Sequence, residues 1–519
     1  MSVEGFSRLR SYLWPIHRHE LRKFLPMLLI SFLIGFNYNV LRATKDALVV
    51  TAPSSGAEAL PFLKVWVIIP FAFLMTFLFT RLCNKMSRER VFYVMMSAFL
   101  SFFCLFAFVL YPFRDYLHPN ALADRLQEVL PIGYHGMVSI FRNWTFTAFY
   151  VMSEMWSTMI LTVLFWGFAN EVTSVKDARR FYTFFSIGAN CSGILAGQVA
   201  VYLSRQTFNP SIPFGSDAWG QSLILLNTII IIVGLLCMGL FRLLHQWGFG
   251  YGSSSTQENN KEEPKIKMGM RKNFRYLAKS KYLIFLAIIV FTYNISINLV
   301  EVIWKNQVKQ LYPDPQQFNA CMGQVLTYIG IISTITAIFV SGNVIRKLSW
   351  KSSAMITPYI ILVTSIGFFS FLLFKNYGLG HIAGLLGTTP LIIIVFFGCL
   401  QNCLARAAKY TFFDATKELA FIPLSPESRL KGKAAIDGVG SRLGKSGGSV
   451  IHQALLIIFG TLSASTPYVA VILFGVVGSW IYAARSLGRQ FNHLVSHHET
   501  LKVPDEEPKT ETEPTPLTT

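Results

Sequence analysis

The feature that most constrains this chain is a series of apolar runs, each about twenty residues long. An α-helix needs roughly 20 apolar residues to cross the hydrocarbon core of a bilayer. Charged residues make up 14% of the chain, compared with about 25% in soluble domains. We therefore expect an all-α polytopic membrane protein with about twelve transmembrane helices, near residues 24–44, 61–81, 91–112, 137–169, 181–203, 220–244, 282–304, 321–345, 354–374, 388–412, 435–461 and 466–485.

The net charge of +19 follows the pattern of membrane topology and does not indicate nucleic acid as a partner. Short basic loops stay in the cytoplasm, so the alternation of basic and poorer loops predicts that both termini are cytoplasmic and that the partner surface is the lipid bilayer. No cleavable signal peptide is evident, and the seven cysteines lie in or beside apolar runs, where we expect buried thiols. The basic residues of these loops are Arg81, Lys85, Arg88, Arg90, Lys176, Arg179, Arg180, Arg346, Lys347, Lys351, Lys417, Arg429, Lys431 and Lys433.

A polar segment divides the chain into two parts of about six helices each. We expect a cytoplasmic N-terminal segment at 1–21, an N-terminal half at 22–245, a cytoplasmic linker at 246–281 and a C-terminal half at 282–489. The remaining residues, 490–519, end in a stretch rich in Pro, Thr and Glu, a composition that predicts disorder.

The two halves carry related motifs at a constant offset. Phe36-x-Tyr38-Asn39 recurs as Phe291-x-Tyr293-Asn294. At the same offset Asp46 falls on Glu301, Glu154 on Lys409, and Asn190 on Lys445. Parallel repeats of this kind describe the major-facilitator architecture, in which the substrate site lies between the halves near the middle of the membrane. We therefore expect two pseudo-symmetric six-helix halves.

Charged residues within the apolar runs are the candidates for the functional site. The stretch Lys431–Gly460 is the most conspicuous, because Asp437 and Lys445 lie among glycines at the start of an apolar run. A charge inside a bilayer costs roughly 2.5–3.5 kcal/mol on insertion scales, so such residues usually face a cavity or a partner. The other candidates are Lys45, Asp46, Lys64, Arg142, Glu154, Glu301 and Lys409.

This mixture of charges favours an anionic substrate. A lysine ammonium suits phosphate oxygens, and acidic partners would hold the lysines while the site is empty. An exchange of partners between carboxylate and substrate would then drive alternating access. Snorkelling at a helix end is an equally good reading for Lys45 and Lys64. Aromatic residues could stack on a nucleobase, although most aromatic residues of a membrane protein serve packing; the candidates are Tyr38, Tyr150, Trp156, Phe291 and Tyr293.

Several long motifs resemble those of a known family. They are Leu41-Arg-x-x-Lys45-Asp, Phe62-Leu-Lys64, Phe149-Tyr-Val-Met-x-Glu154-x-Trp156, Leu164-Phe-Trp-Gly-Phe-Ala-Asn170, Tyr293-Asn-Ile-Ser-Ile-Asn-Leu-Val-Glu301 and Lys431-Gly-Lys-Ala-Ala-Ile-Asp437 with Gly444-Lys-Ser-Gly-Gly448. Together they resemble the non-mitochondrial ATP/ADP translocases of plastids and obligate intracellular bacteria, from about residue 22 to 495.

The resemblance implies an antiporter that imports ATP and releases ADP, in the inner membrane of an intracellular bacterium. It places the family's transport residues on Lys64, Glu154, Glu301 and Lys445. Lys45 lies in an equally good motif, so which of Lys45 and Lys64 contacts phosphate stays open. We add Asn190 and Asn294 as substrate-binding candidates, and Asp46, Arg142, Lys409 and Asp437 as gating or ion-pair candidates.

Charge balance adds phosphate to the expected partners. Bringing ATP⁴⁻ in against ADP³⁻ moves one negative charge inward, against about 2.3 kcal/mol per 100 mV when the interior is negative. Phosphate leaving with ADP would cancel that cost.

Two other functions compete with nucleotide exchange. A proton-coupled nucleotide importer would use Glu154 or Glu301 as its proton carrier. A membrane enzyme would need a nucleophile with its base or a set of metal ligands, whereas the histidines of the apolar and loop regions, His135, His245, His381 and His452, are scattered. We therefore expect no catalytic residue, no metal and no cofactor.

Overall fold

The computed structural model describes residues 16–251, 280–336, 348–375, 379–424, 432–433, 436 and 441–500. Within these ranges the chain consists of helices joined by short loops, without a strand. The gating candidate Asp437, most of the expected linker and residues 501–519 lie outside the described part.

Eleven helical stretches are long and apolar enough to cross a membrane. Six precede the expected linker and five follow it, and each overlaps a run that the sequence predicted. Their bounds are Arg18–Val50, Ala59–Lys85, Arg88–Leu110, Trp144–Val172, Arg180–Ser204, Ala218–Gln246, Lys281–Leu311, Pro315–Ile335, Trp350–Leu373, Pro390–Ala420 and Leu462–Leu494.

Each of these stretches is built from one or more helical elements. In the N-terminal part they are η1 (Arg18–Glu20), α2 (Leu21–Val50), α3 (Ala59–Phe62), η2 (Leu63–Ile68), α4 (Ile69–Lys85), α5 (Arg88–Leu105), η3 (Phe106–Leu110), α9 (Trp144–Met155), η5 (Trp156–Phe165), α10 (Trp166–Val172), α11 (Val175–Ser204) and α12 (Ala218–Gln246). In the C-terminal part they are α14 (Lys281–Leu311), α15 (Pro315–Ile335), α17 (Trp350–Leu373), α19 (Pro390–Ala408), η7 (Lys409–Phe413), α20 (Asp414–Ala420) and α23 (Leu462–Thr500). Short helices lie in the loops: α6 (Arg114–Leu117), α7 (Asn120–Val129), η4 (Ile132–Tyr134), α8 (His135–Arg142) and α18 (Leu379–Leu385).

The remaining expected run, at 435–461, is also helical over α22 (Ser441–Phe459). Its first turns, Ser441-Arg-Leu-Gly-Lys-Ser-Gly-Gly-Ser449, are too polar for it to count among the apolar spans. A helix of this composition must lie against protein or line a water-filled path.

Two differences from the predicted segments change how the chain is divided. The run expected at 137–169 is broken at Asn143, so the fourth span begins at Trp144 and α8 is a separate short helix. At the other end of the chain, α23 continues to Thr500, past the expected start of the tail at residue 490.

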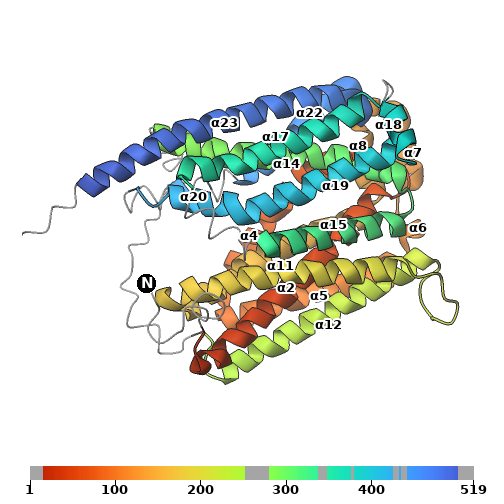
Figure 1. Cartoon of the computed structure of the whole chain (residues 1–519). Coiled ribbons are helices and arrows are strands. Elements are labelled where there is room, and N and C mark those ends of the chain that lie inside the picture. The colour runs from red at the N-terminus through yellow and green to blue at the C-terminus, as the bar shows by residue number, and fades with distance from the viewer. Residues whose placement is uncertain are drawn as a thin grey trace, which may run out of the picture.

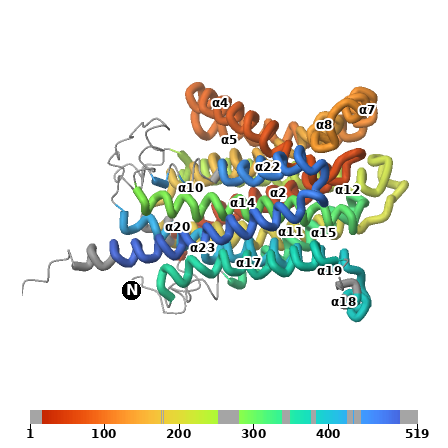
Figure 2. Tube along the Cα trace, turned by 90° about the horizontal axis from the view of Figure 1, so that it is seen from above, coloured from red at the N-terminus to blue at the C-terminus, as the bar shows by residue number. Residues whose placement is uncertain are grey.

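All long helices run roughly along one axis, and α2 begins at the same end of the bundle at which α23 ends (Figure 1). Seen from above, α2 and α14 lie towards the middle, whereas α4 and α17 lie on opposite edges (Figure 2). The central pair is therefore one helix from each part of the chain, at equivalent positions in the repeat.

The two parts meet along two lines of contact. The fifth span α11 packs on the eighth span α15, and α22 packs on α3, η2 and η4. Backbones touch where side chains are absent: a Cβ added to Gly197 would lie 2.4 Å from the carbonyl oxygen of Gly323, and one on Gly133 would lie 2.4 Å from that of Leu456. Close approach of this kind requires glycine.

Polar contacts across the α22 line occur near the C-terminal ends of α2 and α14, away from the chain termini. The Nε2 of Gln453 donates to the carbonyl of Pro61 at 2.8 Å, and the indole of Trp66 donates to the Oε1 of Gln453 at 3.1 Å. Lys309 on α14 donates to the backbone carbonyl of Ser55. These contacts close one end of the boundary between the two parts.

Candidate functional site: an ionic network at the centre of the bundle

The centre of the N-terminal part holds a buried lysine with three partners. Lys45 on α2 is only 3% exposed. Its ammonium lies 2.9 Å from the Oε1 of Glu154 on α9, 3.2 Å from the Oδ1 of Asp46, and 3.7 Å from the centre of the Tyr150 ring. An ammonium held away from water needs such partners, because an uncompensated buried charge is strongly destabilising. Lys45 is thus fixed by two carboxylates and an aromatic face.

The C-terminal part holds a matching group around a carboxylate. Glu301 and Lys305 lie one turn apart on α14, an i,i+4 spacing that places both side chains on one face. The Oε1 of Glu301 accepts from Lys305 at 2.8 Å and from the guanidinium of Arg406 on α19 at 3.1 Å. Two cations therefore share one carboxylate oxygen.

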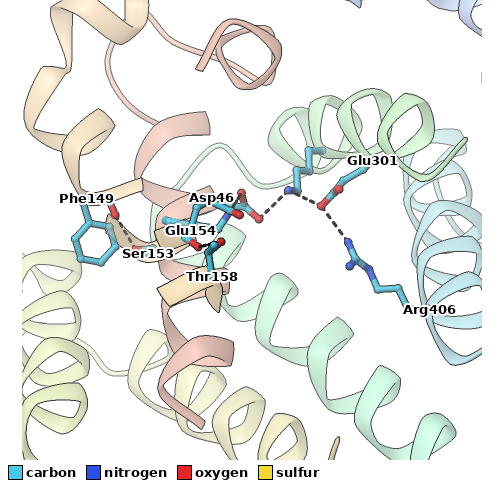
Figure 3. Close-up of polar contacts among 9 residues, drawn as sticks. Asp46, Phe149, Ser153, Glu154, Thr158, Glu301 and Arg406 are labelled. Carbon is cyan, nitrogen blue, oxygen red and sulfur yellow. Dashed lines mark hydrogen bonds and ion pairs between the residues drawn. The ribbon is translucent and has the colours of Figure 1, made fainter. Parts of the chain in front are cut away.

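One ion pair joins these two groups. The Oδ2 of Asp46 lies 2.7 Å from the ammonium of Lys305, and both side chains are almost fully buried. The result is a continuous chain of contacts from Glu154 through Asp46 to Glu301 and Arg406, which crosses the boundary between the two parts (Figure 3).

Three further cations surround the network without a carboxylate partner. Among the described residues, Arg42, Lys64 and Lys445 make no ion pair, whereas the charges of the network act on each of them. Lys445, in the polar first turns of α22, is exposed, and Arg42 and Lys64 are half-buried. Arg42 also lines a cavity of about 300 Å³, a volume that includes the opening of the cavity to solvent. Asp46, Glu301, Lys305 and Arg406 line the same cavity.

The charges of this centre do not balance. The carboxylates of Asp46, Glu154 and Glu301 are matched by Lys45, Lys305 and Arg406. The three unpaired cations are therefore in excess, and inside a membrane protein an excess of positive charge favours an anion with several charges.

Segments with π-helical hydrogen bonding lie at or near three of the predicted site residues. Lys64 is on η2, Glu154 lies two residues before the start of η5, and Lys409 begins η7. Such wide turns are frequent at functional sites because they redirect side chains from an otherwise regular helix.

The remaining predicted site residues lie at the margin of the network or away from it. Lys409 pairs with Asp414 at 3.5 Å, and Asn294 donates to the carbonyl of Val290 at 2.8 Å beside Gly444 of α22. Asn190 lies on α11 where this helix meets Gly330 of α15. Arg142 lies at the end of α8, outside the membrane span, and donates to Asp124 and Gln127.

Three residues of the site were not among the sequence candidates: Arg42, Lys305 and Arg406. Arg42 and Arg406 lie within runs that the sequence identified, so the signal was an intramembrane charge like the others. Lys305 falls one residue after the predicted end of its run, and its i,i+4 relation to Glu301 could have found it.

Comparisons with known proteins identify the family of the chain. The family model described as TLC ATP/ADP transporter matches residues 1–491. The chain is 46% identical over 489 residues to "ADP,ATP carrier protein 1" of Chlamydia pneumoniae, covering 94% of each chain. It is 43% identical over 485 residues to "ADP,ATP carrier protein 1, chloroplastic" of Arabidopsis thaliana, covering 93% of this chain and 76% of the relative.

Solved structures confirm the fold only. A bacterial homologue of the iron transporter ferroportin in an inward-facing state superposes with a TM-score of 0.56 at 15% identity, covering 91% of this chain and 98% of that one. A D-xylose–proton symporter superposes with a TM-score of 0.53 at 15% identity, covering 90% and 97%. The predicted major-facilitator-like, all-helical membrane fold is thereby confirmed.

Proposed function

This chain belongs to the TLC ATP/ADP transporter family, and from that premise we propose that it exchanges ATP for ADP by moving its two halves about the central ionic network. The observation that carries the proposal is the excess of three cations, Arg42, Lys64 and Lys445, around carboxylates that are already paired. Phosphate oxygens of a nucleotide would supply the missing negative charge.

The carboxylates have a separate role in this scheme. Glu154 and Glu301 hold Lys45, Lys305 and Arg406 in place while the site is empty. A nucleotide that enters competes with them for the cations, and this competition weakens the Asp46–Lys305 pair that joins the halves. Binding is thereby coupled to the change from one open side to the other, because a ligand shifts an equilibrium only through different contacts in the two states.

Two observations support an orientation in the membrane. The contacts of Gln453 and Lys309 close the end of the boundary that lies away from the chain termini. The basic loops favour cytoplasmic termini. The described arrangement then faces the cytoplasm, in the inner membrane of an intracellular bacterium, with ATP imported and ADP released.

Phosphate is the expected companion of ADP. One phosphate added to ADP³⁻ makes the outgoing charge at least equal to that of ATP⁴⁻, which removes the opposing cost of about 2.3 kcal/mol per 100 mV. The three unpaired cations around the network supply part of the positive charge that both anions need on the way out.

The test is uptake of labelled ATP into proteoliposomes that are empty or loaded with ADP, or with ADP and phosphate. Uptake only into loaded vesicles supports obligate exchange, and stimulation by internal phosphate supports its movement with ADP. Equal uptake into empty vesicles, driven by a pH gradient, would replace exchange by proton-coupled import. Release of phosphate from ATP by the purified protein would instead indicate an enzyme.

A further inference from the structure

The proposed function leaves open where the base of the nucleotide lies. Three of the aromatic residues that the sequence offered are too buried to stack on a ligand: Tyr150, Trp156 and Tyr293 are 1%, 0% and 4% exposed. Tyr150 is in addition covered by Lys45. The base must therefore meet another surface.

Tyr410 provides such a surface. It lies in η7, within the tenth span, yet it is 39% exposed. The ammonium of Lys409 lies 4.9 Å from the centre of its ring. Tyr38 on α2 is half-buried.

Each of these tyrosines lies four residues from an arginine of the central cavity. On α2, Tyr38, Arg42 and Asp46 follow one another at intervals of four residues, which places them on one face of the helix. On the tenth span, Asn402, Arg406 and Tyr410 show the same interval in the opposite order. Of these six residues, Arg42, Asp46, Asn402 and Arg406 line the same cavity.

Because α2 and the tenth span run in opposite directions, the opposite order of residues places both tyrosines towards the same end of the bundle. Tyr38 precedes Arg42 towards the start of α2, and Tyr410 follows Arg406 towards α20, and both of these lie at the same end of the bundle (Figure 1). Each arginine is thus accompanied by a tyrosine about one turn closer to that end. Since Arg42 and Arg406 line the same cavity, each tyrosine lies about one turn from an arginine of that cavity.

We propose that Tyr410 and Tyr38 form the subsite for the purine base, with the phosphates directed along the cavity towards Arg42 and the central cations. The inference rests on the proposed function, since it assumes that a nucleotide enters this cavity. The aromatic rings offer flat faces for stacking, and the arginines one turn deeper offer charge for phosphate. A ring from each half then touches the same base.

Phe291 is the matched control. It is 37% exposed, similar to Tyr410, and it also faces the polar helix α22, where it contacts the position of Gly447. No arginine follows it at four residues on α14, because that position is Ile295. Phe291 is therefore about as exposed as Tyr410 but has no arginine one helical turn away.

The experiment measures ATP, ADP and tripolyphosphate binding by the full-length protein in detergent, the last as competition against ATP. Tyr410→Ala is expected to weaken binding of both nucleotides by about 5- to 150-fold, the usual range for loss of one base-stacking ring. Binding of tripolyphosphate, which has no base, should stay within about twofold. Tyr410→Phe and Phe291→Ala should remain close to the wild type. Equal loss of ATP and tripolyphosphate, or no loss of either, would overturn the proposal.

A labelling experiment on the wild-type protein removes any dependence on the folding of a variant. Irradiation with 8-azido-ATP should attach the label to peptides that contain Tyr38 or Tyr410, and attachment at Phe291 or elsewhere would contradict the subsite. Exchange by the same preparation is measured in parallel. If exchange is present while the label lies elsewhere, only the base subsite is wrong; if exchange is absent, the proposed function itself is wrong.

Discussion

The carboxylate of Asp46 lies 2.7 Å from the ammonium of Lys305, and this pair links the first span of the N-terminal part to the first span of the C-terminal part. Each residue also has a second partner in its own part: Lys45 for Asp46, and Glu301 for Lys305. The link can therefore break without leaving either charge alone, which is the property required of a contact that opens and closes during transport.

The first prediction concerns the strength of this link. A double-mutant cycle of Asp46→Ala and Lys305→Ala is expected to give a coupling free energy of about 1–3 kcal/mol, as found for contacting residues in one network. Thermal unfolding of the purified protein measures it. The exposed pair of Arg88 and Glu171 is the control, with an expected coupling below about 1 kcal/mol. Equal coupling in the two cycles would mean that the buried pair stabilises the contact between the halves no more than an exposed pair would.

The second prediction concerns Lys445. Because its side chain is exposed on the polar part of α22, Lys445→Ala should leave the protein folded while it lowers the affinity for ATP by at least about tenfold, the usual effect of losing a hydrogen bond to a charged group. Lys445→Arg, which retains the charge, should restore part of the binding. Transport by Lys445→Ala at close to the wild-type rate would remove Lys445 from the site.

The third prediction concerns Glu154, which is a competitor of the substrate in the proposed scheme. Glu154→Gln keeps the shape of the side chain but releases Lys45 from one of its carboxylates. We expect KM for ATP to fall and kcat to fall as well, each by about tenfold, since a difference of 1.4 kcal/mol corresponds to this factor. Initial rates of exchange in proteoliposomes measure both constants. An increase in KM with unchanged kcat would instead make Glu154 a direct ligand.

The fourth prediction concerns the closed end of the boundary. Gly133 lies against the backbone of α22, and an added Cβ would approach the carbonyl oxygen of Leu456 to 2.4 Å. Gly133→Ala should therefore disfavour the arrangement closed at this end and increase the population of the opposite state.

This shift is measured with an impermeant thiol reagent added from the side opposite the termini. A cysteine at Gln453, the residue of α22 that contacts Pro61 across the boundary, reports access in a background without the seven native cysteines. Labelling should become about tenfold faster, which corresponds to 1.4 kcal/mol. Gly167→Ala is the control, because no atom lies within 4 Å of an added Cβ there; unchanged labelling in Gly133→Ala would show that this contact does not control the closed end.

Much of the membrane architecture could be predicted, because the apolar runs are local properties of the sequence. Eleven of the expected runs recur as apolar spans, and the twelfth recurs as the polar helix α22. The break at Asn143 was missed, since apolar residues continue on both sides of it, and with it the position of Arg142 outside the span. The repeat predicted Asp46 and Glu301 as equivalent acidic positions, and both lie in the network.

The pairing of the charges could not be predicted in the same way. Lys45 and Lys64 were equivalent candidates, yet Lys45 is held by two carboxylates and Lys64 by none among the described residues. The excess of cations around the network, on which the proposed anion site rests, depends on this difference.

The sequence by itself determined that the chain crosses a membrane, how its helices are distributed, and which charged residues must find a partner or a cavity, because these follow from the cost of placing each residue in hydrocarbon. Only the tertiary structure decided that Lys305 meets Asp46, that Arg406 meets Glu301, and that Arg42 and Arg406 line one cavity. The physical reason is that ion pairs form over a few ångströms between helices distant in the chain, so they depend on the rotation and depth of each helix.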